Sequence, residues 1–322
     1  MRMLLAMLTL FIAAPATAGG EADPARRIDD NRITVSGISA GAAMAQQLHF
    51  AFPELFSGAG LIAPVPWGCA EGSVTTALGR CTKSTDSAMP VDQFLDAIRA
   101  AAEGGRIGDV SLLRDDRAWL FHGTLDAAVA EPVSRAAEAV YVVFLDREAV
   151  AWVGDVPAAH HFPTRDLGHA CDVMEAPFVG SCDYDAAGQM LQFLYPGLES
   201  PGEETPAALQ AVMLPGAASA GLAETAWLYL PESCPETGCR LHLVLHGCLQ
   251  SEAQAGMQFM ELSGYLPWAA ANQILLAFPQ VAASPVNPLG CWDWWGYTGA
   301  GYLNREAPQM QVLSDWIRSL RQ

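Results

Sequence analysis

The stretch Ile33-Thr-Val-Ser-Gly-Ile-Ser-Ala-Gly-Ala-Ala-Met44 holds a serine at the junction of two different backbone patterns. Its β-branched start predicts a strand, and the small residues from Ala40 onward predict a helix. Between them, residues 37–41 match GxSxG, whose glycines allow a turn sharp enough to push a serine hydroxyl out at the end of the strand. Ser39 is therefore a candidate nucleophile. The alternative is a glycine-rich turn that matches the pattern by chance.

Strand-like and helix-like segments alternate along the rest of the chain, which predicts an α/β fold. Strands are expected near residues 58–63, 118–121, 149–153, 227–230, 241–245 and 274–278, and helices near 132–145, 185–195 and 308–320. Residues 198–206, rich in Pro, Gly and Glu, are a candidate linker. The segment after them adds only a few strands and helices, so we expect it to complete one sheet within a single catalytic domain, residues 19–322.

The first 18 residues have the layout of a secretory signal peptide. Arg2 supplies the positive charge, residues 4–14 are apolar, and Ala16-Thr17-Ala18 offers small residues for cleavage. The apolar run is too short to span a bilayer, and no later segment approaches about 20 apolar residues. We expect an exported protein without a membrane anchor, either periplasmic or extracellular.

Eight cysteines fit an oxidising compartment, which favours disulfides over thiols or zinc. Their order suggests three local pairs and one longer bridge, although eight cysteines allow 105 pairings. The suggested pairs are Cys69 with Cys81, Cys171 with Cys182, Cys234 with Cys239, and Cys248 with Cys291. No ligand spacing typical of a metal site is present, so we expect no metal.

The composition is that of a folded protein, with 51% hydrophobic and 16% charged residues among 322. Its 35 acidic and 17 basic residues give a formal net charge of −18. A charge of this sign repels phosphate backbones and anionic lipid surfaces, so nucleic acid and membranes are not expected partners.

A nucleophilic serine needs a histidine base and a carboxylate that orients the histidine. Asp126 leaves a predicted strand as Ser39 does, and His160 and His161 follow another. The carboxyl ends of strands in an open α/β sheet share one edge, where ligands bind. The chain order Ser, Asp, His agrees with the α/β-hydrolases.

The chemistry also needs amides that stabilise the oxyanion of the transition state. One is expected from Ala40, and the second should follow an earlier strand, but nothing suitable precedes Ser39. The hydrophobic run 241–245 instead ends in His246-Gly247-Cys248, near the other end of the chain. This order predicts a circularly permuted α/β-hydrolase with a mostly parallel sheet flanked by helices.

Six motifs together resemble the single-domain, circularly permuted poly(3-hydroxybutyrate) depolymerases. They are GISAGAAM at 37–44, HGTLDAAV at 122–129, HHFPT at 160–164, CDYDAAGQMLQFLY at 182–195, LHGCLQ at 245–250 and NPLGCWDWWGYTG at 287–299. Two stretches depart from the family pattern, residues 64–67 and 264–270, where the family tends to show GGPY and GYNxWAD. Because these stretches could form the walls of the cleft, the departures bear on the details of substrate binding and not on the type of reaction.

The resemblance implies Ser39 as nucleophile, Asp126 as orienting acid and His160 as base, with His161 as the alternative base. It also implies an oxyanion hole from the amides of Ala40 and Cys248, and a Cys248 to Cys291 disulfide that holds the second amide. It implies no cofactor.

Three tryptophans in four residues, Trp292, Trp294 and Trp295, cannot all face one way on a strand or loop. Aromatic side chains are more often core than binding surface, yet an exposed aromatic patch suits an enzyme that meets an apolar polyester. We expect at least one of the three to line the substrate site.

The sequence thus predicts a secreted serine esterase acting on short-chain poly(3-hydroxyalkanoate), with poly(3-hydroxybutyrate) as the expected substrate. Two alternatives stay open: a carbohydrate esterase of the feruloyl or acetylxylan type, and a non-catalytic hydrolase homologue that binds polymer. The oligomeric state is left open.

Overall fold

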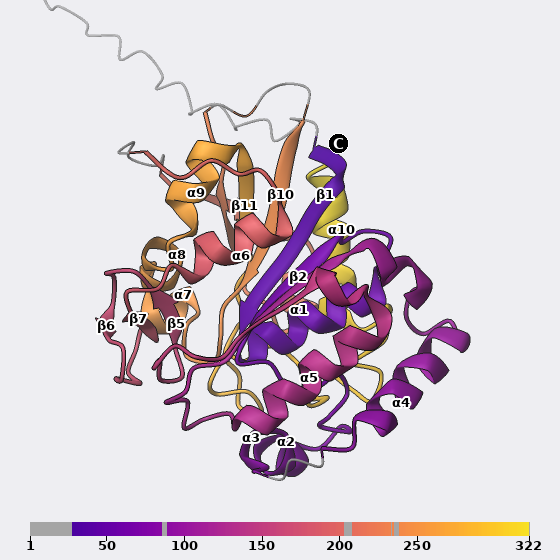
Figure 1. The fold of residues 1–322 in the computed structure, drawn as a ribbon. Helices are drawn as coiled ribbons and strands as arrows, with labels where there is room; N and C mark the ends of the chain where they lie inside the picture. Colours follow the sequence, from indigo (N-terminus) through magenta and orange to yellow (C-terminus); the bar gives the residue numbers. More distant parts are fainter. Residues whose placement is uncertain (1–27, 86–88, 203–207, 233, 235–237, 322) are drawn as a thin grey trace, which may run out of the picture.

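A computed structural model describes residues 28–85, 89–202, 208–232, 234 and 238–321. Within these residues an eight-stranded sheet forms the centre of the molecule, in the order β4-β3-β2-β1-β10-β11-β9-β8 (Figure 1). The strands are β1 (Ile28–Ile38), β2 (Gly58–Ile62), β3 (Arg117–Phe121), β4 (Val150–Val153), β8 (Gln210–Met213), β9 (Thr225–Tyr229), β10 (Cys239–Leu245) and β11 (Ile274–Phe278).

The strands from β4 to β11 in this order are parallel, and only the pairings of β9 with β11 and of β8 with β9 are antiparallel. Such a sheet is buried on both faces, which is why β2 and β11 are apolar throughout. The sheet draws strands from both sides of residues 198–206. Strand β10 lies directly beside β1, in the position that the permuted order predicts.

Helices cover both faces of the sheet. Helices α1 (Ala40–Ala51), α4 (Val91–Glu103), α5 (Glu131–Phe144) and α10 (Pro308–Ser319) lie on one side, and α6 (Ala186–Leu194) and α9 (Tyr265–Asn272) on the other (Figure 1). Proline near the starts of α5 and α10 favours helix initiation, since its fixed φ suits the first turn. Helix α1 is buried along its whole length, which requires its alanines and glycine. Helix α4 was not predicted.

Shorter elements surround the edge of the sheet that carries the loops. They are the helices α2 (Val74–Leu78), α3 (Arg80–Lys83), α7 (Glu252–Ala255) and α8 (Gln258–Leu262), and a second sheet of β5 (Phe162–Thr164), β7 (Val179–Ser181) and β6 (His169–Ala170). This small sheet was not predicted, because strands of two or three residues are too short to show a period.

All eight cysteines are paired in the four disulfides expected from their order: Cys69–Cys81, Cys171–Cys182, Cys234–Cys239 and Cys248–Cys291. This is the state that an oxidising compartment favours. The signal peptide predicted for residues 1–18 lies outside the described residues. Among the described helices, none has the length and apolarity needed to cross a bilayer.

Candidate active site

Ser39 occupies the turn between β1 and α1 in a strained backbone conformation, with φ 57° and ψ −119°. A positive φ is uncommon for a residue other than glycine, and it persists only where the surroundings hold it in place. Here the Ser39 N–H donates to the carbonyl of Ile62 at the end of β2, 2.9 Å away. The neighbouring strand thus fixes the turn, and Ser39 stays partly exposed.

Both glycines of the GxSxG pattern are required by close backbone contact. A Cβ on Gly37 would lie 2.4 Å from the carbonyl oxygen of Gly41, and a Cβ on Gly41 would lie 2.3 Å from the carbonyl oxygen of Leu245. Neither contact can relax, because each involves backbone of a buried element. The turn at Ser39 is therefore packed directly against the end of β10.

Asp126 and His160 form a hydrogen-bonded pair, with 2.7 Å between Asp126 Oδ2 and His160 Nδ1. The other carboxylate oxygen, Oδ1, accepts the amides of Ala128 and Val129 at 2.8 Å each. The Asp126 side chain is 1% exposed, and burial alone would raise its pKa. The hydrogen bonds from His160 and the two amides outweigh burial and hold the pKa of the carboxyl below its usual value. Asp126 is therefore ionised. Because it contacts His160 Nδ1, the Nε2 of His160 points away from the carboxylate.

The loops that carry this pair are packed against each other. Gly123 approaches the 156–158 segment so closely that a Cβ would lie 2.1 Å from the carbonyl oxygen of Ala158. The amides of Thr124 and Leu125 donate to the carbonyls of Val156 and Ala158. The spacing between Asp126 and His160 is thus set by main-chain bonds on both loops.

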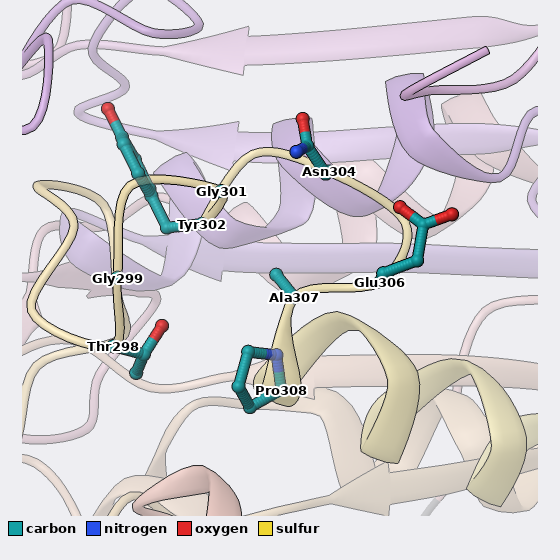
Figure 2. A pocket seen from close by; sticks show the side chains of 8 residues that line it. All are labelled: Thr298, Gly299, Gly301, Tyr302, Asn304, Glu306, Ala307 and Pro308. Atoms are coloured by element: carbon teal, nitrogen blue, oxygen red, sulfur yellow. The ribbon is translucent and has the colours of Figure 1, made fainter.

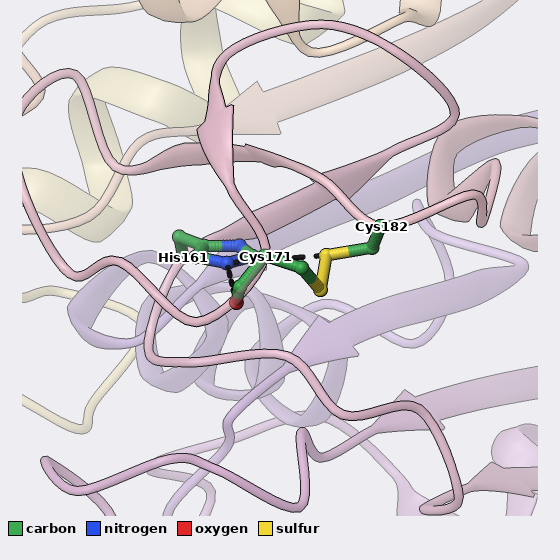
Figure 3. Close-up of side chains that lie close together, drawn as sticks. All are labelled: His161, Cys171 and Cys182. Atoms are coloured by element: carbon green, nitrogen blue, oxygen red, sulfur yellow. Dashed lines mark hydrogen bonds between the residues drawn. A yellow bond between two sulfur atoms is a disulfide. The ribbon is translucent and has the colours of Figure 1, made fainter.

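His161 turns the other way. Its Nε2 donates to the carbonyl of Cys171 at 2.7 Å (Figure 3). A Cβ on Gly180 would lie 2.2 Å from the His161 ring, so the ring lies on the backbone of Gly180. Burial lowers the pKa of this imidazole, so it is neutral at pH 7. The sulfurs of Cys171 and Cys182, near the ring, are bonded to each other and offer no thiolate to a metal. Of the two adjacent histidines, His160 is the one that contacts a carboxylate.

The turn after β10 lies beside Ser39. Strands β1 and β10 are parallel, and Gly37 pairs with Leu245. Ser39 and Gly247 each follow this pair by two residues, so they lie at the same end of the two strands. Gly247 lies next to Ile38: a Cβ on Gly247 would be 3.3 Å from the carbonyl oxygen of Ile38. Within the described residues, neither the Ala40 nor the Cys248 amide donates to a protein acceptor. These two amides are the predicted oxyanion donors.

The tryptophan segment divides into a buried and a partly open part. Trp292 is fully buried and donates its indole N–H to the carbonyl of His246 at 2.9 Å. It supports the turn after β10 and has no surface to offer a substrate, so the expectation for this residue is corrected. Trp294 is 9% exposed, and Trp295 is half-buried.

The chain after the tryptophans folds around Asp293, whose carboxylate accepts the amides of Gly296, Tyr297 and Thr298. The residues that follow line a small hollow; they include Thr298, Asn304 and Glu306 (Figure 2). None of the predicted catalytic residues lines it. Sequence reasoning also passed over Gln250, which is buried beside the turn at Gly247.

Comparison with known proteins finds that the chain is similar to polyhydroxybutyrate depolymerases. The chain is 37% identical over 301 residues to a poly(3-hydroxybutyrate) depolymerase from Delftia acidovorans; the match covers 91% of this chain but only 60% of that protein. It is 30% identical over 327 residues to a polyhydroxybutyrate depolymerase from Talaromyces funiculosus, covering 95% of this chain and 94% of the relative. No family model matches the sequence.

Solved structures agree over nearly the whole chain. The crystal structure of the depolymerase from Penicillium funiculosum superposes with a TM-score of 0.85 at 28% identity, covering 92% of this chain and 97% of that one. A serine-to-alanine variant of a depolymerase complexed with an R3HB trimer superposes with a TM-score of 0.86 at 28% identity, covering 94% and 99%.

Proposed function

This chain belongs to the polyhydroxybutyrate depolymerase family, and on that premise we propose that it hydrolyses the backbone esters of poly(3-hydroxybutyrate) as a serine esterase. The observation that carries the proposal is the 2.7 Å hydrogen bond between Asp126 and His160, at the same sheet edge as the strained turn of Ser39. A related depolymerase that binds a trimer of the polymer's monomer supports the choice of substrate.

In the proposed reaction, Ser39 Oγ attacks the ester carbonyl while His160 Nε2 accepts the hydroxyl proton. Asp126 keeps His160 in the tautomer whose Nε2 is free to accept, and it stabilises the imidazolium that forms. His160 then protonates the departing alcohol, which leaves an acyl group on Ser39. Water activated by the same imidazole releases the 3-hydroxyacyl product and restores the serine.

In each tetrahedral intermediate the negative charge is on the former carbonyl oxygen of the ester. The amides of Ala40 and Cys248 would donate hydrogen bonds to this oxygen. Ala40 is the first residue of α1, so its N–H has no partner within the helix and also lies at the positive end of the helix dipole. The Cys248–Cys291 disulfide and the Trp292 hydrogen bond hold the second donor in place. Donors held in advance stabilise charge without reorganising during the reaction, and each is worth about 3 to 4 kcal/mol.

Apolar side chains stand next to the proposed machinery. Leu125 precedes Asp126 and is 49% exposed, and Leu249 follows Cys248 and is 37% exposed. Together with Trp295, and to a smaller extent Trp294, they would offer an apolar surface to a polyester chain. This setting favours a polyester over a polar carbohydrate ester.

We place the reaction outside the cytoplasm and assign it to residues 19–322 as one catalytic domain. The four disulfides fit an oxidising compartment, and the interleaved sheet supports a single folding unit.

Hydrolysis of emulsified poly(3-hydroxybutyrate) tests the proposal, with release of ferulate and of acetate from substituted xylan measured in parallel. We expect clearing of the polyester and no comparable release from xylan; the reverse result would assign a carbohydrate esterase. Labelling by a fluorescent organophosphonate, absent from Ser39→Ala, separates a working nucleophile from a protein that only binds polymer.

A further inference from the structure

Gln250 uses its whole side-chain amide to join two loops. The residue is 2% exposed, and its Oε1 accepts the N–H of Gly247 at 2.6 Å. Its Nε2 donates to the carbonyls of Pro177 and Phe178 at 3.0 Å each. Buried amides that make all their hydrogen bonds inside the protein fix the groups that they contact, because breaking one bond leaves a polar atom unpaired.

The groups that Gln250 contacts are next to, or hydrogen-bonded beside, the chain segments that carry the proposed oxyanion donor and the proposed base. Gly247 immediately precedes Cys248. The carbonyl of Phe178 also accepts the N–H of Phe162 at 2.8 Å, and Phe162 opens β5 only two residues after His160. Phe178 has a φ of 54°, a conformation that a bulky residue keeps only when its surroundings hold it.

No disulfide of the described chain makes the same connection. Cys248–Cys291 ties the turn after β10 to the tryptophan segment, and Cys171–Cys182 closes a loop on the side of the base. The two regions meet through the side chain of Gln250.

We propose that Gln250 is a positioning residue, which holds the amide of Cys248 in register with the imidazole of His160. The inference rests on the proposed function above. Both groups act on the same tetrahedral intermediate, so a shift of one loop against the other weakens the oxyanion bond at the moment of proton transfer. A misplacement of about 1 Å in an active site can cost on the order of 100-fold in rate.

Gln250→Met removes all three hydrogen bonds at nearly constant volume. We expect kcat for a soluble 3-hydroxybutyrate trimer to fall by about 10- to 100-fold, since loss of a complete oxyanion donor costs about 100- to 1,000-fold. KM should change little, because the substrate's binding surface is untouched. The number of active sites is counted by phosphonate labelling, so that kcat refers to folded enzyme.

Gln280→Met is the matched control. Gln280 is 3% exposed and also bridges two segments, accepting the amide of Glu252 and donating to the carbonyl of Phe278. It touches neither the Gly247 amide nor the carbonyls beside β5. Its loss should lower the melting temperature as much as Gln250→Met does, with kcat close to wild type.

Gln250→Glu supplies a rescue that depends on pH. The introduced carboxylate would face two carbonyl oxygens in a buried site, so its pKa is raised, and its protonated form regains a donor. The ratio of its kcat to that of the wild type should therefore rise as pH falls from 8 to 5.5, whereas the ratio for Gln250→Met should stay flat.

Equal kcat losses in Gln250→Met and Gln280→Met, or an unchanged kcat in Gln250→Met, would overturn the inference. A flat ratio for Gln250→Glu would overturn it as well. Failure of the proposed function is seen separately, as a wild-type protein that does not hydrolyse the trimer at all.

Discussion

Two serines near the end of β1 can each be paired with a histidine, and only one of the two pairs has the surroundings that the proposed reaction needs. Ser39 stands at the end of β1, on the sheet edge where His160 contacts Asp126. Ser36, three residues earlier, is itself hydrogen-bonded to a histidine: its Oγ lies 2.7 Å from His242 Nε2. The second pair has the contact that a nucleophile and base need, yet it sits inside the protein.

The surroundings of His242 explain the difference. Its Nδ1 contacts the hydroxyl of Thr34 at 2.6 Å, where His160 contacts a carboxylate, and Ser36 also contacts the hydroxyl of Tyr265. Ser36 and His242 have no exposed surface, and burial lowers the pKa of His242 to about 3. A neutral imidazole without a carboxylate or access to substrate joins strands; it does not move protons for a reaction. The contact between Ser36 and His242 is therefore structural, because neither a carboxylate nor solvent access accompanies it.

The largest expected effect is the loss of turnover in Ser39→Ala. Removing the nucleophile should lower kcat for the 3-hydroxybutyrate trimer by roughly 10⁵- to 10⁶-fold, by comparison with serine proteases. The fold should be retained, because the Ser39 hydroxyl makes no capping hydrogen bond to helix α1 that its removal would break. Initial rates and thermal unfolding measure the two quantities. Ser36→Ala is the control on the same strand and should keep its turnover; full activity in Ser39→Ala would remove Ser39 from the reaction.

Asp126→Asn should reduce kcat by about 10⁴-fold, because an amide in this place favours the wrong tautomer of His160. The asparagine oxygen can still accept the amides of Ala128 and Val129, so the loop should stay folded. Turnover and near-ultraviolet circular dichroism are the measurements. A variant with wild-type rate would exclude Asp126 as the orienting acid.

Stability should fall as the pH is lowered below about 6.5. His242 and His246 are buried, with folded pKa values of about 3 and about 4, whereas an unfolded histidine titrates near 6.5. Between these values the unfolded chain binds more protons, so the free energy of unfolding is highest above pH 6.5 and is lost on acidification. From pH 7 to pH 5 each imidazole should remove about 2 kcal/mol.

Urea unfolding at several pH values checks this dependence. His242→Gln should reduce the slope of stability against pH, because one of the two imidazoles is gone. An identical slope in the variant would contradict the role given to His242.

The smallest expected effect is the destabilisation by Ser36→Ala. It leaves His242 Nε2 without its buried partner and leaves the Tyr265 hydroxyl with only the sulfur of Met190, which should cost about 1 to 3 kcal/mol of unfolding free energy. Urea unfolding at pH 7 gives the value, and the trimer assay should show wild-type turnover. A stable variant with reduced turnover would reverse the comparison between the two pairs.

Much of the architecture could be predicted because its signals are local. The strand before Ser39 and the helix after it follow from adjacent residues, and β11 was expected at the same bounds, Ile274–Phe278. The order of the cysteines suggested the four pairs that the structure contains, although it did not exclude other pairings. Helix α4 was not predicted, although its sequence is amphipathic.

Other features could not be read from local patterns. His160 and His161 are adjacent and chemically identical, and only the contacts to Asp126 and to the Cys171 carbonyl tell them apart. Trp292 looked like its neighbours but is fully buried against His246. Gln250 gave no signal of its own, since its partners at Pro177 and Phe178 lie more than 70 residues away.

The amino-acid sequence by itself determined the α/β alternation and the sharp turn at Ser39, because each depends on backbone preferences within a short segment. Only the tertiary structure decided which histidine meets Asp126, which tryptophan is buried, and which distant carbonyls Gln250 contacts. Those outcomes depend on which faces of distant strands and loops pack together. The register of β1 against β10 and the hydrogen bonds of the turn after β10 set that packing.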